Sequence, residues 1–175
     1  GEALAGEPPV PDLRALCVTR GFLGQMSGLT DAAFGAQVEG MFPIALAGDE
    51  DQRAIHLPAM ASGQTVVALA LLDGDDGPAV ARQRDEDTYV LSGSKAMVPL
   101  APVSDRAVVL ARHAGEATPS FSLFVVSTDA CRVSAQAVLS PLPTGTLAFD
   151  DVEVDAEDRI GGAGQGLTVV QATLD

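Results

Sequence analysis

The sequence predicts an α+β protein in which N-terminal helices precede an antiparallel β-barrel or sandwich. Apolar residues recur at helical spacing from residue 11 to about residue 62. From Gly63 onward the pattern changes to short apolar and β-branched segments, which follow one another at intervals of roughly 10 to 15 residues. Turn-forming sequences separate these segments and no helical stretch lies between them, so a parallel doubly wound sheet is not expected.

The N-terminal helical segment is predicted to occupy residues 1–62, beginning with a short lead-in rich in Gly, Pro and Glu. Pro11-Asp12 is typical of a helix start, and Thr30-Asp31 is a suitable N-cap for a second helix. Asp49 is expected to cap a third helix, because the acidic residues that follow favour a helix N-terminus. Pro58 is expected to end that helix.

The β domain is predicted over residues 63–161, where turn residues alternate with candidate strands. The strands are QTVVALALL, TYVLSG, RAVVLAR, SFSLFVVS, CRVSAQAV and GTLAFDDVEV. Residues 89–91 and 95–98 are expected to form a hairpin with a turn at residues 92–94, and Pro99 is expected to end its second strand. A last helix is predicted to begin at residues 162–175, with Leu167, Val170 and Leu174 on one face, and to be cut off by the chain end.

The amino-acid composition argues against some classes of binding partner. The net charge is −14, with 24 acidic and 10 scattered basic residues, so neither a nucleic acid nor an anionic membrane is an expected partner. No leader sequence or membrane-length apolar run is present, which favours a cytoplasmic protein. The two cysteines, Cys17 and Cys131, are expected to be small buried apolar residues, and no metal site is predicted.

Three local features are interpreted as structural. GGAGQG, residues 161–166, lacks the βαβ surroundings of a nucleotide loop and is expected to lead into the last helix. The acidic residues between 150 and 158, like Asp73, Asp75 and Asp76, are expected to be solvated. Lys95 has three interpretations: an exposed strand lysine, which is preferred, a partner of a local acid, or a phosphate ligand.

Several segments, in order, resemble the acyl-CoA dehydrogenase family over roughly residues 34–174. TYVLSGSK is similar to a family hairpin Y-x-L-x-G-x-K, and SDRAVVLAR is similar to the strand A-D-x-x-V-x-A-R. LAFDDVEVDAEDRIGGAGQGL resembles the passage F-x-D-V-x-V-P-x-x-x-x-x-G-x-x-x-x-G, with Asp155 in place of the proline. The resemblance implies a helical domain, a middle β domain and a C-terminal helical domain, the last beyond the sequence given.

The resemblance also implies FAD as cofactor, an acyl-CoA or other acyl thioester as substrate, and α,β-desaturation as the reaction in fatty acid metabolism. The family flavin stretches L-T-E-P-x-x-G-S-D and W-I-[ST]-N correspond to residues 71–79 and 97–100 here. The implied cofactor-binding residues are Leu71, Leu72, Met97, Val98 and Pro99, and the implied substrate-binding residues are Gly77 and Pro78. No catalytic residue is identified, because the usual base of the family is a glutamate in the C-terminal domain.

The replacements leave three functional hypotheses open. Leu72, Met97, Pro99 and Leu100 replace the hydroxyl, indole and amide groups of the family stretches, and Pro99 lacks a backbone N–H. The first hypothesis is a flavin-dependent acyl-CoA dehydrogenase. The second is a flavin-deficient chain that binds an acyl thioester or serves as a partner subunit, and the third is a plain interaction module. The expected protein partner is a second copy of the chain or a flavin-bearing homologous subunit.

Overall fold

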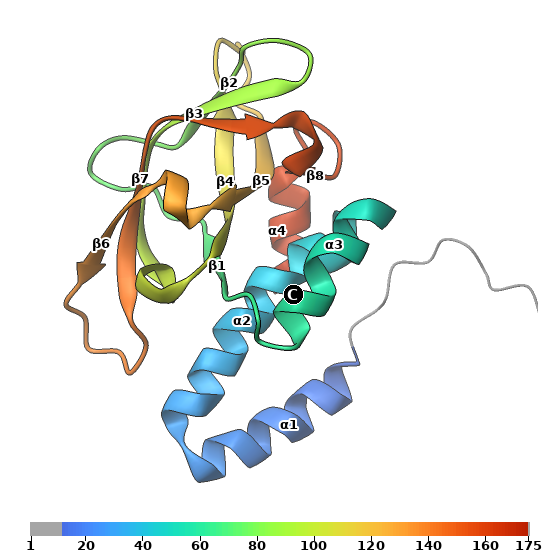
Figure 1. The fold of residues 1–175 in the computed structure, drawn as a ribbon, viewed down its shortest axis with the longest axis vertical. Coiled ribbons are helices and arrows are strands. Elements are labelled where there is room, and N and C mark those ends of the chain that lie inside the picture. The colour runs from blue at the N-terminus through green and yellow to red at the C-terminus, as the bar shows by residue number, and fades with distance from the viewer. Residues whose placement is uncertain (1–11, 175) are drawn as a thin grey trace, which may run out of the picture.

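The computed structural model describes residues 12–174, in which three helices precede an eight-stranded sheet and a fourth helix follows it (Figure 1). The helices are α1 (Leu13–Met26), α2 (Gly28–Ala47), α3 (Glu50–Ala61) and α4 (Gly166–Leu174). The strands are β1 (Val67–Ala70), β2 (Val80–Gln83), β3 (Thr88–Pro99), β4 (Arg106–His113), β5 (Phe121–Ser127), β6 (Arg132–Gln136), β7 (Thr144–Asp155) and β8 (Arg159–Ile160). The predicted α+β class is confirmed.

The first two helices begin at capping side chains. The Asp12 carboxylate accepts hydrogen bonds from two N–H groups in the first turn of α1, as the sequence predicts. The predicted cap of α2 at Thr30-Asp31 is wrong. The hydroxyl of Ser27 accepts the Thr30 N–H at 3.3 Å, so the helix starts one turn earlier. Asp31 instead lies in the first turn, where its carboxylate pairs with Arg20 of α1 at 2.8 Å.

The third helix has the predicted cap and runs past the predicted end. Asp49 and Gln52 form a capping box, in which the side-chain oxygen of each residue accepts a hydrogen bond from the backbone N–H of the other. The Gln52 amide also donates to two backbone carbonyls just before and at the start of β8. Pro58 lies inside α3 and does not end it. Burial of Met60, which is 1% exposed, stabilises the turn beyond the proline.

The sheet is mostly antiparallel, and its described strands do not close into a barrel. The hydrogen-bonded order is β6-β7-β3-β2-β4-β5-β8, with β1 beside β4. The barrel closure that the strand spacing predicts is therefore absent among residues 12–174. The parallel pairs β1–β4 and β2–β4 were not predicted, and neither were the short strands β2 and β8.

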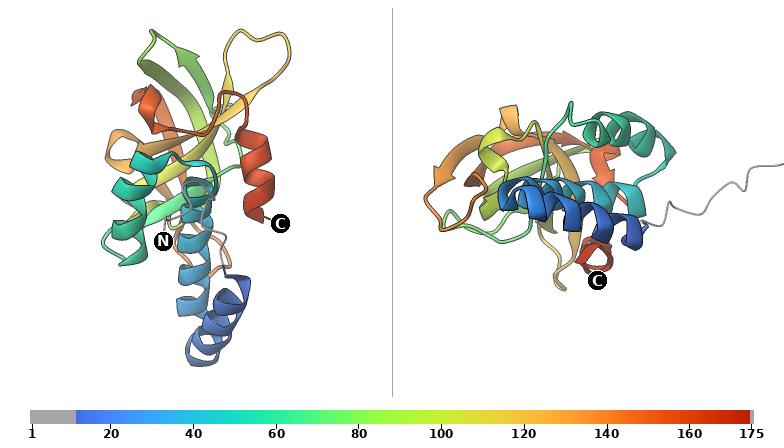
Figure 2. Two further views of the ribbon diagram at one scale, coloured as in Figure 1. Left: turned by 90° about the vertical axis from the view of Figure 1, so that its right-hand side faces the viewer. Right: turned by 90° about the horizontal axis from the view of Figure 1, so that it is seen from below.

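Strand β4 is buried on both faces, which explains its unbroken apolar sequence. Ala107, Val109 and Ala111 point into a core enclosed by the strands. Val108 and Leu110 point into a second core between the sheet and helices α2, α3 and α4. Figure 2 shows these helices beside the sheet, whereas α1 lies along the far end of α2, away from the strands. A strand covered on both faces reads as a continuous apolar run.

The hairpin predicted within residues 89–98 is wrong, because β3 is one continuous strand of twelve residues. Gly93 adopts φ +106° at a register shift against β7, so the expected turn is a bulge. A Cβ atom at Gly93 would lie 2.1 Å from the carbonyl oxygen of Pro78. Glycine therefore allows β3 to pass the Pro78 backbone without a turn.

Helix α2 lies close to β1, which places it beside the candidate site. A Cβ atom at Gly40 would lie 2.8 Å from Val67 Cγ1, so the two elements approach each other closely. The Gln37 amide donates to the carbonyls of Met60 and Thr65, at 3.0 and 2.8 Å, and its oxygen accepts the Val67 N–H at 3.0 Å. The Gln37 side chain thus joins α2, α3 and β1, and both its amide nitrogen and its amide oxygen are hydrogen-bonded.

Two further sequence interpretations need correction. The buried face of α4 consists of Gly166, Val169 and Thr173, whereas Leu167 and Leu174 are exposed. Cys17 is exposed and Cys131 is half-buried, so only the second approaches the expected environment. Burial raises the pKa of the Cys131 thiol to about 11. None of the helices within residues 12–174 combines the length and the apolar character that crossing a membrane would require.

Candidate functional site

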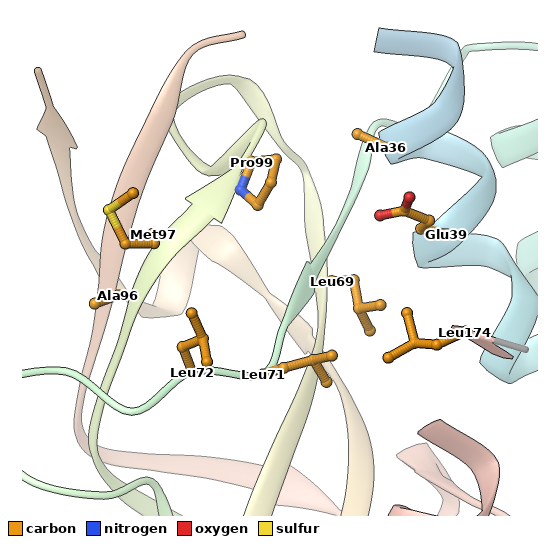
Figure 3. A pocket seen from close by; sticks show the side chains of 9 residues that line it. All are labelled: Ala36, Glu39, Leu69, Leu71, Leu72, Ala96, Met97, Pro99 and Leu174. Carbon is orange, nitrogen blue, oxygen red and sulfur yellow. The ribbon is translucent and has the colours of Figure 1, made fainter. Parts of the chain in front are cut away.

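A cavity of about 170 Å³ opens between the sheet and two helices (Figure 3). Its lining comes from three places: the β3 wall, the β1 segment and the helix wall. The β3 wall is Ala96, Met97 and Pro99, the β1 segment is Leu69, Leu71 and Leu72, and the helix wall is Ala36 and Glu39 of α2 with Leu174 of α4. Within residues 12–174, Glu39 is the only ionisable lining residue, so the surface that this part of the chain offers to a ligand is largely apolar.

Met97 gives the β3 wall an unusual backbone. It adopts φ +55° within a register shift between Lys95 and Val98, and Leu100 follows at φ +64°. A non-glycine residue in this region costs roughly 1–2 kcal/mol, so the surrounding structure must hold the bulge. The Met97 N–H donates to Gln136 Oε1 at 3.0 Å, and Met97, which is 49% exposed, is one of the lining residues (Figure 3).

The β1 segment is hydrogen-bonded to the β3 wall. The Ala96 N–H donates to the Leu72 carbonyl at 2.9 Å, and Asp73 pairs with Lys95 as an antiparallel bridge. Leu72 is 64% exposed, which is unusual for a large apolar side chain next to a cavity. An exposed leucine in this position is available to pack against a bound molecule.

Lys95 is buried, contrary to the preferred sequence interpretation of an exposed strand lysine. Its side chain is 3% exposed, and its Nζ donates to Asp73 Oδ1 at 2.7 Å and to the Leu71 carbonyl at 2.9 Å. Burial lowers the pKa of the Lys95 ammonium, while the Asp73 carboxylate acts in the opposite direction. The interpretation as a partner of a local acid is the one that the structure supports.

The residues proposed from the resemblance fall into two groups. Leu71, Leu72, Met97 and Pro99 line the cavity, although about 25 residues separate the two pairs in sequence. Val98 is 1% exposed and belongs to the core enclosed by the strands, because alternate residues of β3 point to opposite sides. Gly77 and Pro78 lie in the turn before β2 and do not line this cavity.

Several lining residues were not predicted from the sequence. Ala36, Glu39 and Leu174 reach the cavity only because α2 and α4 pack beside β1, and nothing in their local sequence indicates this. Leu69 and Ala96 were accessible to prediction. Leu69 lies two residues before Leu71 on the same side of an extended segment, and Ala96 adjoins Met97.

The lining residues would suit the ring of a flavin by packing more than by hydrogen bonding. Apolar side chains such as Leu72 and Met97 provide surfaces suited to a flat aromatic ring. The polar edge of the ring finds fewer partners. The Met97 N–H is already bonded to Gln136, Pro99 has no N–H, and the Leu71 carbonyl accepts from Lys95. Each missing partner weakens binding by about 1–3 kcal/mol.

A second hollow, of about 230 Å³, is less suited to an acyl-CoA. It lies between α3 and the segment before β8, and four carboxylates line it: Asp49, Asp51, Glu157 and Asp158. Burial raises the pKa of Asp158 and lowers that of His56 in the same hollow. This concentration of acidic groups would repel the phosphates of coenzyme A, so the first cavity is the better candidate site of the two.

Comparisons with known proteins agree with this architecture. Residues 74–156 match the family model of the acyl-CoA dehydrogenase middle domain. A probable acyl-CoA dehydrogenase of Bacillus subtilis is 31% identical over 153 residues, which are 80% of this chain and 25% of the relative. A 3-(aryl)acrylate reductase of Clostridium sporogenes is 29% identical over 143 residues, 75% of this chain and 38% of the relative.

Solved structures show the same arrangement. The acyl-CoA dehydrogenase of Bacillus anthracis, solved in complex with FAD, superimposes with a TM-score of 0.82 at 27% identity. The superposition covers 97% of this chain and 30% of that one. The chain thus spans less than half of the length of the relatives it matches. With its helices and sheet arranged as in these solved structures, the chain carries the acyl-CoA dehydrogenase middle domain at residues 74–156.

Proposed function

We propose that this chain provides the flavin-facing and acyl-facing surfaces of an acyl-CoA dehydrogenase-type oxidoreductase. The observation that carries the proposal is the convergence of Leu71, Leu72, Met97 and Pro99 on one apolar cavity. These four residues occupy the positions of two family flavin stretches, and the chain carries the middle domain of that family. The Bacillus anthracis relative, whose structure contains FAD, supports FAD as the cofactor.

The chain's own residues would act by packing and by positioning. Met97 and Leu72 would contact the isoalloxazine ring, and Pro99 would limit its movement on the side of the β3 wall. When bound, FAD supplies hydride acceptance for the α,β-desaturation of an acyl thioester. Gly77 and Pro78, in the turn before β2, are proposed to contact the substrate. No residue of this chain is assigned as the base that removes the α-proton.

A flavin-deficient function is the second candidate, and the backbone of the β3 wall favours it. The Met97 N–H is satisfied within the protein and Pro99 has none, so two positions of the wall offer no donor to a cofactor. A chain of this kind would bind an acyl thioester without redox chemistry, or would assemble with a flavin-bearing homologous subunit.

Titration of the purified chain with FAD tests the proposal. We expect saturable binding, seen as FAD absorbance near 450 nm that stays with the protein. The Kd should be roughly 1–100 μM, because the cavity offers few polar partners to the flavin. Leu72→Asp, which places a charge in the cavity, should abolish binding. Ile55→Asp is the matched control, because Ile55 is similarly exposed and lies outside this cavity.

Butyryl-CoA decides between the two candidates. A saturable rise in Tm with butyryl-CoA, together with no FAD binding at millimolar FAD, would replace the first candidate with the second. Absence of both effects would contradict flavin binding and acyl-thioester binding by this chain, and would leave the partner subunit and the plain interaction module. Stoichiometric FAD binding that Leu72→Asp removes and Ile55→Asp retains would support the first.

A further inference from the structure

Lys95 is the only lysine in the sequence, and its environment is unusual for a strand residue next to a cavity. Its ammonium is buried and has two oxygen partners, Asp73 Oδ1 at 2.7 Å and the Leu71 carbonyl at 2.9 Å. Both partners belong to the segment that leaves β1. One buried cation therefore connects β3 to the backbone and the side chain of a neighbouring loop.

The Lys95–Asp73 ion pair lies between two lining groups of the cavity. Leu71 and Leu72 of the β1 segment immediately precede Asp73, and Ala96 and Met97 of the β3 wall immediately follow Lys95. The ion pair thus sits at the point where the two linings meet.

Further hydrogen bonds extend the connection along the loop. Asp73 Oδ1 also accepts the Ala79 N–H at 3.2 Å, so one carboxylate oxygen joins Lys95 to the start of β2. The Gly74 N–H donates to the Ser94 carbonyl at 3.0 Å, and the Ser94 N–H donates to the Gly77 carbonyl at 3.0 Å. A Cβ atom at Gly74 would lie 2.4 Å from Ser94 Oγ, so the loop backbone lies close to β3 at a position that has little room for a side chain.

Stability alone is a weak explanation for this ion pair. A buried ion pair gains little over well-packed apolar side chains, because removing the charges from water offsets their attraction. Asp73 is 49% exposed, so water can solvate its carboxylate when the lysine is removed. The contribution of Lys95 to the free energy of unfolding is therefore expected to be small, and its main effect is expected on the position of the loop.

We propose that Lys95 is a positioning residue, whose ammonium holds the Leu71 carbonyl and the Asp73 carboxylate and thereby fixes the β1 segment against the β3 wall. The role in ligand binding rests on the proposed function of the cavity. The role in ordering residues 71–77 does not, because it concerns the chain without ligand. These two parts need separate measurements.

Lys95→Met tests both parts, since methionine keeps the unbranched shape and removes the charge. Amide hydrogen exchange in residues 71–77 should accelerate by about tenfold or more relative to exchange in β4 and β5. FAD and butyryl-CoA, as the two probes, should each bind about tenfold more weakly. The urea midpoint of global unfolding should change little, which separates positioning from general destabilisation.

Two more variants keep the test decisive. Asp73→Asn leaves the lysine in place and removes its charged partner, so it should also accelerate exchange in residues 71–77. The double variant should resemble Lys95→Met, because both changes remove the same interaction. Arg84→Met is the matched control: Arg84 belongs to an exposed ion pair with Glu153 in the same sheet, and its loss should leave residues 71–77 unaffected.

The outcomes distinguish failure of the positioning role from failure of the proposed function. Unchanged exchange in residues 71–77 for both single variants overturns the positioning role, whatever the ligands do. The same holds if exchange accelerates equally in every strand. Localised acceleration in a wild-type chain that binds neither FAD nor butyryl-CoA supports the ordering role and contradicts the proposed function.

Discussion

The two halves of β3 belong to one strand and differ in backbone geometry. Residues 88–91 pair with β7 on one side of the strand. Residues 89–92 pair with β2 on the other side. In residues 94–99 the register against β7 shifts, and Met97 takes a positive φ. The first half contributes Tyr89 and Leu91 to the core, and the second contributes Ala96, Met97 and Pro99 to the cavity. The regularly paired half thus supplies side chains to the core, whereas the half with the shifted register lines the candidate site.

The largest contrast between the halves is expected for truncation to alanine. Leu91→Ala removes a fully buried side chain and should lower the free energy of unfolding by about 2–5 kcal/mol. Met97→Ala removes a half-exposed side chain and should lower it by less than about 1 kcal/mol. Urea titration measures both. Equal losses would mean that the two halves do not differ in the way described.

Glycine should have opposite effects in the two halves. Met97→Gly relieves the positive φ and should raise the free energy of unfolding by up to about 1 kcal/mol, after the greater flexibility of glycine in the unfolded chain is subtracted. Val90→Gly, in the regular half, should lower it by more than about 1 kcal/mol. A loss of stability in Met97→Gly would contradict a strained bulge.

The pH dependence of stability should reveal the buried cation of the irregular half. Burial lowers the pKa of Lys95 from its ordinary value of 10.5, with Asp73 the charged group that faces it. Between the lowered pKa and 10.5 the unfolded chain binds more protons than the folded chain. The free energy of unfolding of the wild type should therefore rise with pH in that window, relative to Lys95→Met.

Denaturant titrations of the two proteins at several alkaline pH values measure this difference. Any lysine signal belongs to Lys95, because the sequence contains no other lysine. A difference between the proteins that stays constant up to pH 10.5 would show that the folded chain leaves the Lys95 pKa unshifted.

The smallest effect on stability is expected for an exposed ion pair beside the regular half of β3. Arg84, just after β2, pairs with Glu153 of β7, and both side chains are about half exposed or more. Water and salt screen such a pair, so Arg84→Met should give no resolvable change in the urea midpoint. A clear loss of stability would indicate that surface charges hold this edge of the sheet.

Features with local causes were predicted from the sequence more often than features with tertiary causes, although the cap of α2 at Ser27 was missed. The helix start at Asp12 and the cap at Asp49 were identified because helix starts depend on a few neighbouring residues. The strands β4 and β5 were identified because their burial on both faces leaves an unbroken apolar sequence. The turn at residues 92–94 was wrong because Gly93 serves equally in a bulge, and only the nearby Pro78 backbone decides between the two.

The candidate site shows the same division. Leu71, Leu72, Met97 and Pro99 were accessible through the family resemblance, which carries information on three-dimensional position. Glu39 lies on a helix whose packing beside β1 no local pattern indicates. The burial of Lys95 was missed because its partner, Asp73, precedes it by 22 residues on a separate segment.

Amide hydrogen exchange with and without saturating FAD and butyryl-CoA tests the central claim most directly. Slower exchange in residues 71–74 and 96–100, with unchanged exchange in α1, is the result that the proposed cavity predicts. Helix α1 is a suitable reference because it lies away from the sheet and has no buried residues. Protection confined to other segments, or no protection with either compound, would contradict the assignment of this cavity as the ligand site.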